Sequence, residues 1–298
     1  SVDKAVDCVG LGREARRPLP TDDEMRVRLD ALEDAIANDK KDGVKPLCIV
    51  AMAGTTNTGA VDDLVALRRI ADREGMWIHA DAAYGGGMLL SGRHAGILRG
   101  LELADSVTID PHKWFFAPLD AGALLVKDAA RLTASFGFKP PYLTDEKDVD
   151  DQRYQYFVHG FEQSRRFRSL KVWMSFKRYG AKQIGAWIDA NVDAVDHLDR
   201  LVRASDDFES LVRPKMSAIC IRYRAPRLGE PARARLHAEA SRRIEQGGRF
   251  WFSTTRIKDK AWFRICPVNF RTRREHMDEL LATLRKECAE IERAGDRR

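Results

Sequence analysis

Two short segments constrain this chain most, because each is an apolar run of strand type that ends in a charged residue. The first runs over 77–86 and reaches Asp81, and the second runs over 105–114 and reaches Lys113. Ligands of open α/β sheets bind outside the carboxyl ends of the strands. The two segments therefore predict an aspartate and a lysine at one edge of a mostly parallel sheet.

Such a pair supplies the two groups that pyridoxal phosphate (PLP) requires. A lysine forms a Schiff base with the cofactor aldehyde, and an aspartate keeps the pyridine nitrogen protonated so that the ring accepts electrons. The lysine must lose its proton to attack, which a partly desolvated site favours. A surface lysine and a helix-capping aspartate are the structural alternatives, but the pairing of Lys113 with Asp81 favours a cofactor site.

Four motifs in order along the chain resemble those of one enzyme family. They are Gly54-Thr55-Thr56-x-Thr58-Gly59, His79-x-Asp81-Ala82-Ala83-Tyr84-Gly85, Asp110-Pro111-His112-Lys113-Trp114 and Arg165-Arg166-Phe167-Arg168-Ser169-Leu170-Lys171. The chain resembles the group II PLP-dependent amino-acid decarboxylases, and most closely the aromatic-L-amino-acid and tyrosine decarboxylase branch. This resemblance implies the α/β fold of the fold-type-I PLP-dependent transferases, with helices on both faces of a mostly parallel sheet.

The resemblance also implies roles for residues around the aspartate and the lysine. Thr56 contacts the ring-oxygen side of PLP, unless it only forms a turn, and Ala83 lies against one ring face. Asp110 and His112 lie near the phosphate or the lysine, although some relatives carry Asn at the position of Asp110. His79 points to the same strand face as Asp81, where it either bonds within the site or is a satisfied core histidine.

In the family, a tyrosine on a mobile loop protonates the substrate carbon after carbon dioxide leaves, and the loop excludes water. A gapless count back from the 165–171 block reaches Tyr156. Tyr154 is the alternative, and His159 lies close enough in sequence to participate. Arg271 is either a ligand of the substrate carboxylate or a surface residue.

Composition excludes several other classes of protein. No run of about 18 apolar residues indicates a membrane span, and the excess of +6 charges is scattered, which does not favour nucleic-acid binding. The five cysteines show no metal-ligand spacing, so no metal site is expected. Three of them lie in strand-like runs and are expected to be buried, namely Cys48, Cys220 and Cys266. Buried free cysteines favour a reducing, cytoplasmic location.

The hydrophobic pattern divides the chain of 298 residues into two expected domains. Strands alternating with helices predict a partial large PLP-binding domain over 1–205, with a lid loop at about 138–160. An N-cap signal at Thr21 predicts a helix through about Asn38. From 206 to 298 the pattern predicts a small α+β domain.

Two local breaks are also predicted. Helices are expected over 167–179 and 182–202, separated near Gly180, and a hairpin is expected around 258–260.

We therefore expect decarboxylation of an L-amino acid, preferably an aromatic one, to the amine and carbon dioxide. Another fold-type-I reaction, by a carbon–carbon lyase or a transaminase, is the second hypothesis. The third is an inactive, truncated relative that serves as a binding or structural subunit, because family members carry a long region ahead of the part that matches Ser1. The resemblance implies a homodimer, with the lid reaching across the interface.

Overall fold

The computed structural model describes residues 1–138 and 154–295. Most of the expected lid loop lies outside these residues. The α-helices are α1 Val2–Cys8, α2 Leu29–Lys41, α3 Leu64–Glu74, α4 Pro111–Trp114, α5 Ala129–Phe136, α6 Arg168–Arg203, α7 Glu230–Gln246 and α8 Arg274–Gly295. The β-strands are β1 Cys48–Met52, β2 Trp77–Asp81, β3 Ser106–Ile109, β4 Ala123–Val126, β5 Phe208–Ser210, β6 Ile219–Tyr223, β7 Ser253–Ile257 and β8 Lys260–Ile265.

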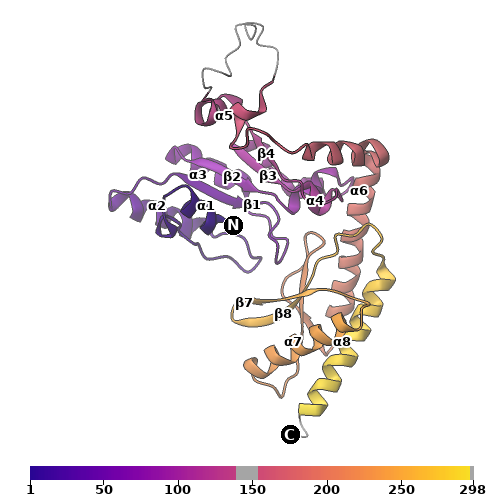
Figure 1. Ribbon diagram of the computed structural model, residues 1–298. Helices are drawn as coiled ribbons and strands as arrows, with labels where there is room; N and C mark the ends of the chain where they lie inside the picture. Colours follow the sequence, from indigo (N-terminus) through magenta and orange to yellow (C-terminus); the bar gives the residue numbers. More distant parts are fainter. Residues whose placement is uncertain (139–153, 296–298) are drawn as a thin grey trace.

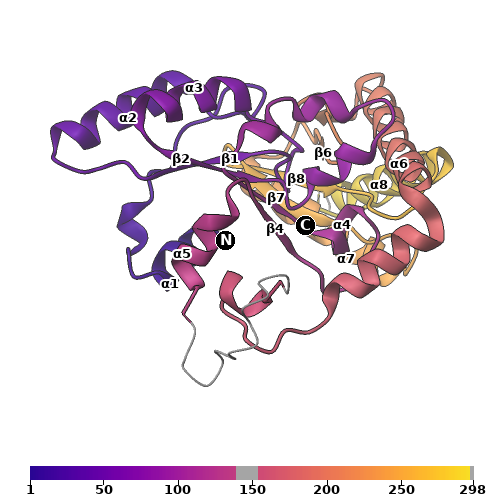
Figure 2. The same ribbon diagram turned by 90° about the horizontal axis from the view of Figure 1, so that it is seen from above.

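The N-terminal part of the chain forms a four-stranded sheet in the order β1-β2-β3-β4. The first three strands are parallel, and β4 pairs with β3 in the antiparallel direction. Figure 2 shows α2 and α3 on one side of this sheet and α1 and α5 on the other. The expected mostly parallel sheet is confirmed.

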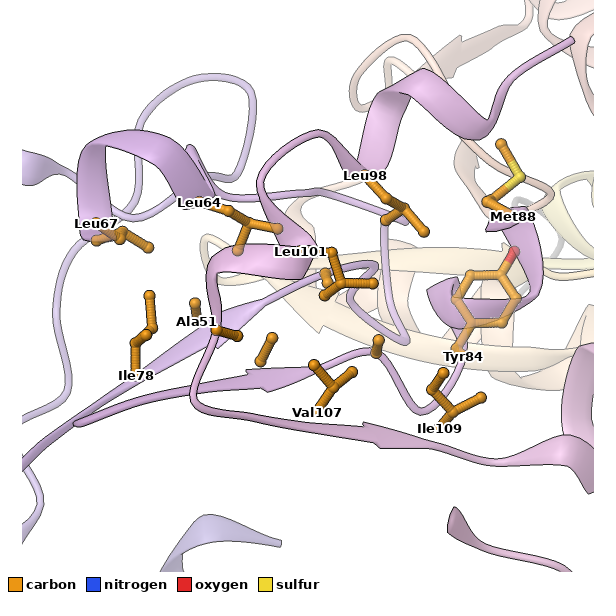
Figure 3. Close-up of a cluster of buried hydrophobic side chains, with 14 of the residues drawn as sticks. Ala51, Leu64, Leu67, Ile78, Tyr84, Met88, Leu98, Leu101, Val107 and Ile109 are labelled. Atoms are coloured by element: carbon orange, nitrogen blue, oxygen red, sulfur yellow. The ribbon is translucent and has the colours of Figure 1, made fainter. Parts of the chain in front are cut away.

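Helix α3 shows why the sequence folds as it does beside this sheet. The Asp63 carboxylate accepts a hydrogen bond from the Ala66 N–H and so caps the first turn, and Gly75 ends the helix in the left-handed region. Between these caps, apolar side chains at helical spacing face the strands. Leu64 and Leu67 of this helix pack with Ile78 and Val107 in a core that Figure 3 shows above the sheet.

The helix predicted from Thr21 is wrong in its start, because α2 begins at Leu29. Thr21 instead forms an isolated antiparallel bridge with Val27. Between them, the Asp22 carboxylate accepts bonds from the backbone N–H groups of Glu24 and Arg26, which closes a tight turn. The N-cap signal was therefore a turn signal, since an aspartate can bond its own neighbourhood in either way.

Helix α6 connects this sheet to the C-terminal part of the chain (Figure 1). Gly180 interrupts it with φ 76° and ψ 153°, as the predicted separation of two helices near this glycine requires. Val192 packs with the first core, whereas Ala194, Val195 and Leu198 pack with a second core. One helix therefore contributes to both cores.

The second core lies between α6, α7 and α8 and a four-stranded antiparallel sheet in the order β5-β6-β8-β7. The hairpin predicted around 258–260 is confirmed, with Lys258 and Asp259 both at positive φ between β7 and β8. The segment that contains β5 to β8, α7 and α8 (residues 208–295) is called the small domain below.

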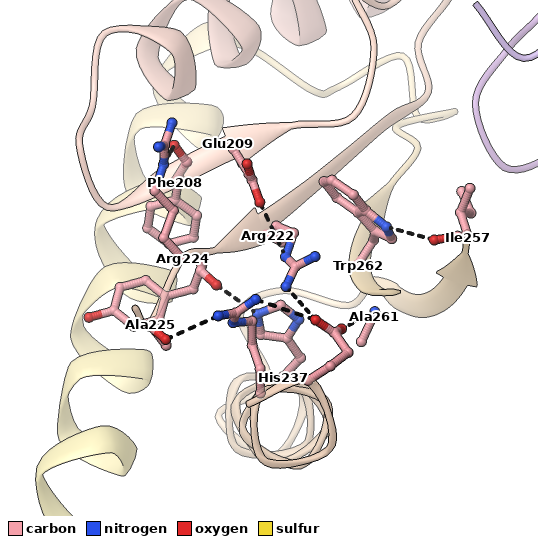
Figure 4. Close-up of polar contacts among 12 residues, drawn as sticks. Phe208, Glu209, Arg222, Arg224, Ala225, His237, Ile257, Ala261 and Trp262 are labelled. Carbon is pink, nitrogen blue, oxygen red and sulfur yellow. Dashed lines mark hydrogen bonds and ion pairs between the residues drawn. The ribbon is translucent and has the colours of Figure 1, made fainter. Parts of the chain in front are cut away.

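A polar cluster in the small domain surrounds the buried side chain of Arg222 (Figure 4). Arg222, only 1% exposed, forms ion pairs with Glu209 at 3.3 Å and Glu230 at 2.7 Å. Its guanidinium also lies 5.3 Å from the centre of the Trp262 ring. His237 is fully buried beside this cluster, and its Nε2 lies 3.4 Å from the Tyr223 carbonyl oxygen.

One expectation about cysteines is wrong. Cys48 is exposed because it opens β1, at the edge of the sheet, whereas Cys220 is buried and Cys266 is partly buried. In the part of the chain that the structure describes, every helix is too short or too polar to cross a bilayer.

Candidate active site

Three loops meet at the carboxyl ends of β1, β2 and β3. The first follows β1 and is called here the Thr56 loop (residues 54–59), the second follows Asp81, and the third carries Lys113. The first two are in direct backbone contact, because a Cβ added to Gly85 would lie 1.9 Å from the Ala53 carbonyl oxygen. The second and third are joined by a hydrogen bond from the Asp110 N–H to the Ala83 carbonyl, at 3.1 Å. The predicted convergence of these segments is present.

Asp81 ends β2 with its side chain half-buried on the sheet face opposite the Leu64 core. One carboxylate oxygen, Oδ1, accepts a hydrogen bond from the Ala83 N–H at 3.1 Å, which orients the group. The other oxygen has no partner among residues 1–138 and 154–295. This second oxygen can therefore accept a hydrogen bond from a protonated ring nitrogen while Oδ1 keeps its bond from the Ala83 N–H.

His79 lies two residues before Asp81 on the same face of β2. Its Nδ1 is 2.8 Å from the Ser106 hydroxyl, and its Nε2 is 3.2 Å from the Thr108 hydroxyl. Burial lowers the pKa of His79, which favours the neutral ring between two hydroxyl groups. Of the two expected roles, this geometry favours a satisfied histidine that supports the strand.

Lys113 lies in the short helix α4, just after β3. Its Nζ is 2.9 Å from Oδ2 of Asp110, and its side chain is 36% exposed. The same carboxylate oxygen is 4.0 Å from Nε2 of His112, whose Nδ1 lies 2.6 Å from the Ala121 carbonyl oxygen. Asp110 thus contacts the amine of Lys113 in this structure.

The residue after the lysine anchors α4 in the core. Trp114 is 1% exposed and stacks on Tyr84, with ring centres 4.9 Å apart. Its Nε1–H donates to Oδ1 of Asn191 at 3.1 Å, and Nδ2 of Asn191 donates to the Asn269 carbonyl at 2.9 Å. The residue that follows the lysine is therefore anchored to α6 and, through Asn191, to the small domain.

The Thr56 loop is a compact turn closed by its own hydrogen bonds. The Thr55 N–H donates to the Ala60 carbonyl, and the Gly59 N–H donates to the Thr55 carbonyl, each at 2.9 Å. Thr55 Oγ1 also lies 2.9 Å from Thr58 Oγ1. Thr56 remains exposed, and its hydroxyl bonds to no residue of the described chain, so it is available to a ligand.

Tyr156 is not brought to Lys113 within this chain. It opens the 3-10 helix η7 (Tyr156–His159), which is joined to α5 by a contact of 3.4 Å between His159 Nε2 and Thr133 Oγ1. Figure 1 shows α5 at the far end of β4 from α4. Tyr156 is 62% exposed and Tyr154 is 61% exposed, and their rings are 4.7 Å apart.

Arg271 is exposed, and its guanidinium lies 5.6 Å from the centre of the Phe270 ring.

Sequence reasoning gave no role to Tyr84, although its hydroxyl is 2.8 Å from the Ser217 hydroxyl of the small domain. Burial raises the pKa of Tyr84 well above its usual range, so the phenol stays neutral. No local pattern could have paired residues that lie so far apart in sequence.

The donor set fits a flat pyridine ring that carries an aldehyde. Four groups lie at one edge of the sheet: the oriented carboxylate of Asp81, the amine of Lys113, the exposed hydroxyl of Thr56 and the small side chain of Ala83. A metal ion has less support, since the structure groups no three His, Cys, Asp or Glu side chains suitably within the described ranges.

Comparison with known proteins agrees with this chemistry. The chain matches the pyridoxal-dependent decarboxylase conserved domain over residues 1–224. It is 32% identical over 292 residues to an aromatic-L-amino-acid decarboxylase of Bacillus atrophaeus, covering 98% of this chain and 61% of that protein. It is also 32% identical over 222 residues to an L-2,4-diaminobutyrate decarboxylase of Acinetobacter baumannii, covering 74% of this chain and 43% of that protein.

Solved structures give the same answer. The crystal structure of Oryza sativa TDC with PLP and tryptamine superimposes with a TM-score of 0.90 at 27% identity, covering 97% of this chain and 60% of that one. Catharanthus roseus tryptophan decarboxylase in complex with L-tryptophan gives a TM-score of 0.85 at 26% identity, covering 97% and 60%. The chain therefore spans less than two thirds of the length of each relative named here.

Proposed function

Since the chain belongs to the pyridoxal-dependent decarboxylase family, we propose that it takes part in PLP-dependent decarboxylation of an L-amino acid to the amine and carbon dioxide. One observation carries this proposal: Asp81 and Lys113 stand at the ends of neighbouring parallel strands, joined through the bond between Ala83 and Asp110. When bound, PLP supplies an electron-accepting ring that takes up the electron pair left by carbon dioxide.

The residues of this chain would then divide the work. Asp81 holds the proton at the ring nitrogen through its free oxygen, Thr56 donates to the ring-oxygen side, and Ala83 leaves room for one ring face. Lys113 provides the amine that attaches the cofactor, and His112 lies near it. Asp110, 2.9 Å from the amine, orients the lysine before the cofactor arrives.

We further propose that the substrate is aromatic, which is supported by the relative in Bacillus atrophaeus and the tryptamine-bound rice structure. Tyr156 is the proposed acid that protonates the substrate carbon. Because it lies beside α5, away from Lys113 of its own chain, we propose that it serves the site of a second copy in a homodimer. A cytoplasmic location is part of the same proposal, supported by five free cysteines.

The first experiment labels the lysine. The chain is incubated with PLP, reduced with borohydride and digested, and the modified lysine is mapped by mass spectrometry. We expect stoichiometric labelling at Lys113, and Asp81→Asn should raise the half-saturating PLP concentration by about tenfold or more, since a hydrogen bond to a charged group is lost.

The control is Lys127→Ala, which removes an exposed lysine at the end of β4 and should leave the labelling unchanged. Labelling scattered over surface lysines would contradict the cofactor site. Amine and carbon dioxide release in a panel of L-amino acids then tests the substrate class, and transfer of amino groups instead would contradict decarboxylation.

A further inference from the structure

Three neighbouring strands of the small domain hold the Thr56 loop from outside. The Arg264 Nε–H of β8 donates to the Thr56 carbonyl at 2.6 Å. The Cys220 thiol of β6 donates to the Asn57 carbonyl at 3.2 Å, and the Thr255 hydroxyl of β7 donates to Oδ1 of Asn57 at 3.3 Å. The large sheet thus contacts the small domain through the loop that presents Thr56.

These donors are arranged by the sheet that carries them. Cys220 is paired directly with Arg264, and Arg264 is paired with Ser253. Thr255 lies two residues beyond Ser253 and therefore on the same face. Ser253 also accepts a bond of 3.4 Å from the Arg264 guanidinium, which fixes its direction. Three donors on one rigid face meet the loop together.

Packing and backbone conformation restrict the two ends of the loop as well. A Cβ added to Gly59 would lie 3.2 Å from the Met216 Cβ, and one added to Gly54 would lie 2.9 Å from the Met216 sulfur. Both glycines have positive φ, 110° at Gly54 and 70° at Gly59. Met216 therefore packs against both ends of the loop, which leaves little room for the loop to change shape.

We propose that Arg264 is a positioning residue for the cofactor site, which holds Thr56 in place through its carbonyl oxygen. This inference rests on the proposed function for the cofactor, and on geometry alone for the loop. Of the three donors only Arg264 is charged, and a charged donor forms the stronger bond. Loss of Arg264 loosens the Thr56 loop and weakens PLP binding, although Arg264 itself touches neither PLP nor Lys113.

The first arm of the test needs no cofactor. Hydrogen exchange is measured in the cofactor-free chain at the amides of Thr55 and Gly59, which are bonded inside the loop. We expect faster exchange in Arg264→Ala, by about fivefold or more if half of a charged hydrogen bond is transmitted to the loop. Arg264→Lys should be intermediate, and amides of α3 report whether the variants remain folded.

Arg256→Ala is the matched control, because Arg256 lies on the same hairpin but is exposed on the opposite face, 3.8 Å from Asp259. Equal loop exchange in Arg264→Ala and Arg256→Ala would overturn the proposal.

The second arm repeats the borohydride labelling of Lys113 over a range of PLP concentrations. The half-saturating concentration should rise by about tenfold in Arg264→Ala, recover partly in Arg264→Lys and stay unchanged in Arg256→Ala. Faster loop exchange with unchanged half-saturation would overturn the link to the cofactor. If the unaltered chain takes no label at Lys113, the proposed function fails, whereas the exchange measurement still decides whether Arg264 holds the loop.

Discussion

At the scale of single residues, burial determines the charge of groups far from the site. His237 is fully buried in the small domain, and burial lowers its pKa to about 4, with the charges of Arg222 and Arg233 acting in the same direction. Its Nδ1 has no hydrogen-bond partner among the residues described. The folded chain therefore prefers the neutral ring.

This preference makes stability depend on pH. In the unfolded chain the pKa of His237 returns to about 6.5, so below that pH the unfolded state binds a proton that the folded state refuses. Above pH 6.5 the ring is neutral in both states, so His237 adds no pH dependence there. As the pH drops from 6.5 towards 4, the free energy of unfolding falls by about 3 kcal/mol because of this group. Urea unfolding at pH 7 and pH 4.5 measures the loss, which should be smaller in His237→Gln. An equal loss in both proteins would contradict this account.

At the scale of elements, one glycine sets the course of the longest helix. Gly180 has φ 76° and ψ 153°, a region that only glycine adopts readily, and no atom lies within 4 Å of its added Cβ. A substitution there meets backbone strain without any steric clash. The bend allows the first half of α6 to leave the axis of the second half, which packs in the small domain.

Gly180→Ala should therefore lower the free energy of unfolding by about 2 kcal/mol. Gly96→Ala is the control, because its Cβ also meets open space and its φ is not in the left-handed range. Chemical denaturation of both variants measures the difference. Equal stability of the two variants would show that the backbone conformation at position 180 does not require glycine.

Elements with strong local signals were predictable from the sequence. The parallel strands, the break at Gly180 and the hairpin at Lys258 each depend on periodicity or turn chemistry that neighbouring residues decide. The start of α2 was not predictable, because Asp22 serves a helix cap and a tight turn equally well, and only the bridge from Thr21 to Val27 selects the turn.

The candidate site divides in the same way. Asp81 and Lys113 could be found because strand ends of one sheet must converge. The contacts of Asn191 and Arg264 could not be found, because each joins segments far apart in sequence that meet only after both cores have formed. The roles of all the site residues remain predictions, those of Asp81 and Lys113 as much as those of Tyr156 and Arg271.

At the scale of the whole molecule, an apolar stripe on the first half of α6 is left open to solvent. Leu170 is 39% exposed, Trp173 is 58% exposed and Met174 is 56% exposed. Side chains at this spacing lie on one face of a helix. A contiguous apolar surface of this kind is typical of an interface, and it supports the proposed homodimer.

Trp173→Glu should shift the protein from dimer to monomer, because it would place a charge inside a desolvated contact. Sedimentation velocity over a range of concentrations measures the change, with at least a tenfold weaker association expected for a lost aromatic anchor. Trp251→Glu is the control, since Trp251 is 74% exposed on the small domain. Unchanged association in Trp173→Glu would place any interface elsewhere.

The attachment of the Thr56 loop has a consequence for how this site tolerates mutation. Its two shortest contacts end on the main-chain oxygens of Thr56 and Asn57, which every amino acid possesses. Side chains at positions 56 and 57 can therefore be exchanged in a library without detaching the loop from β6 and β8. New ligand contacts can therefore be selected at these two positions, while the bonds from Arg264 and Cys220 keep the backbone of the loop attached to the small domain.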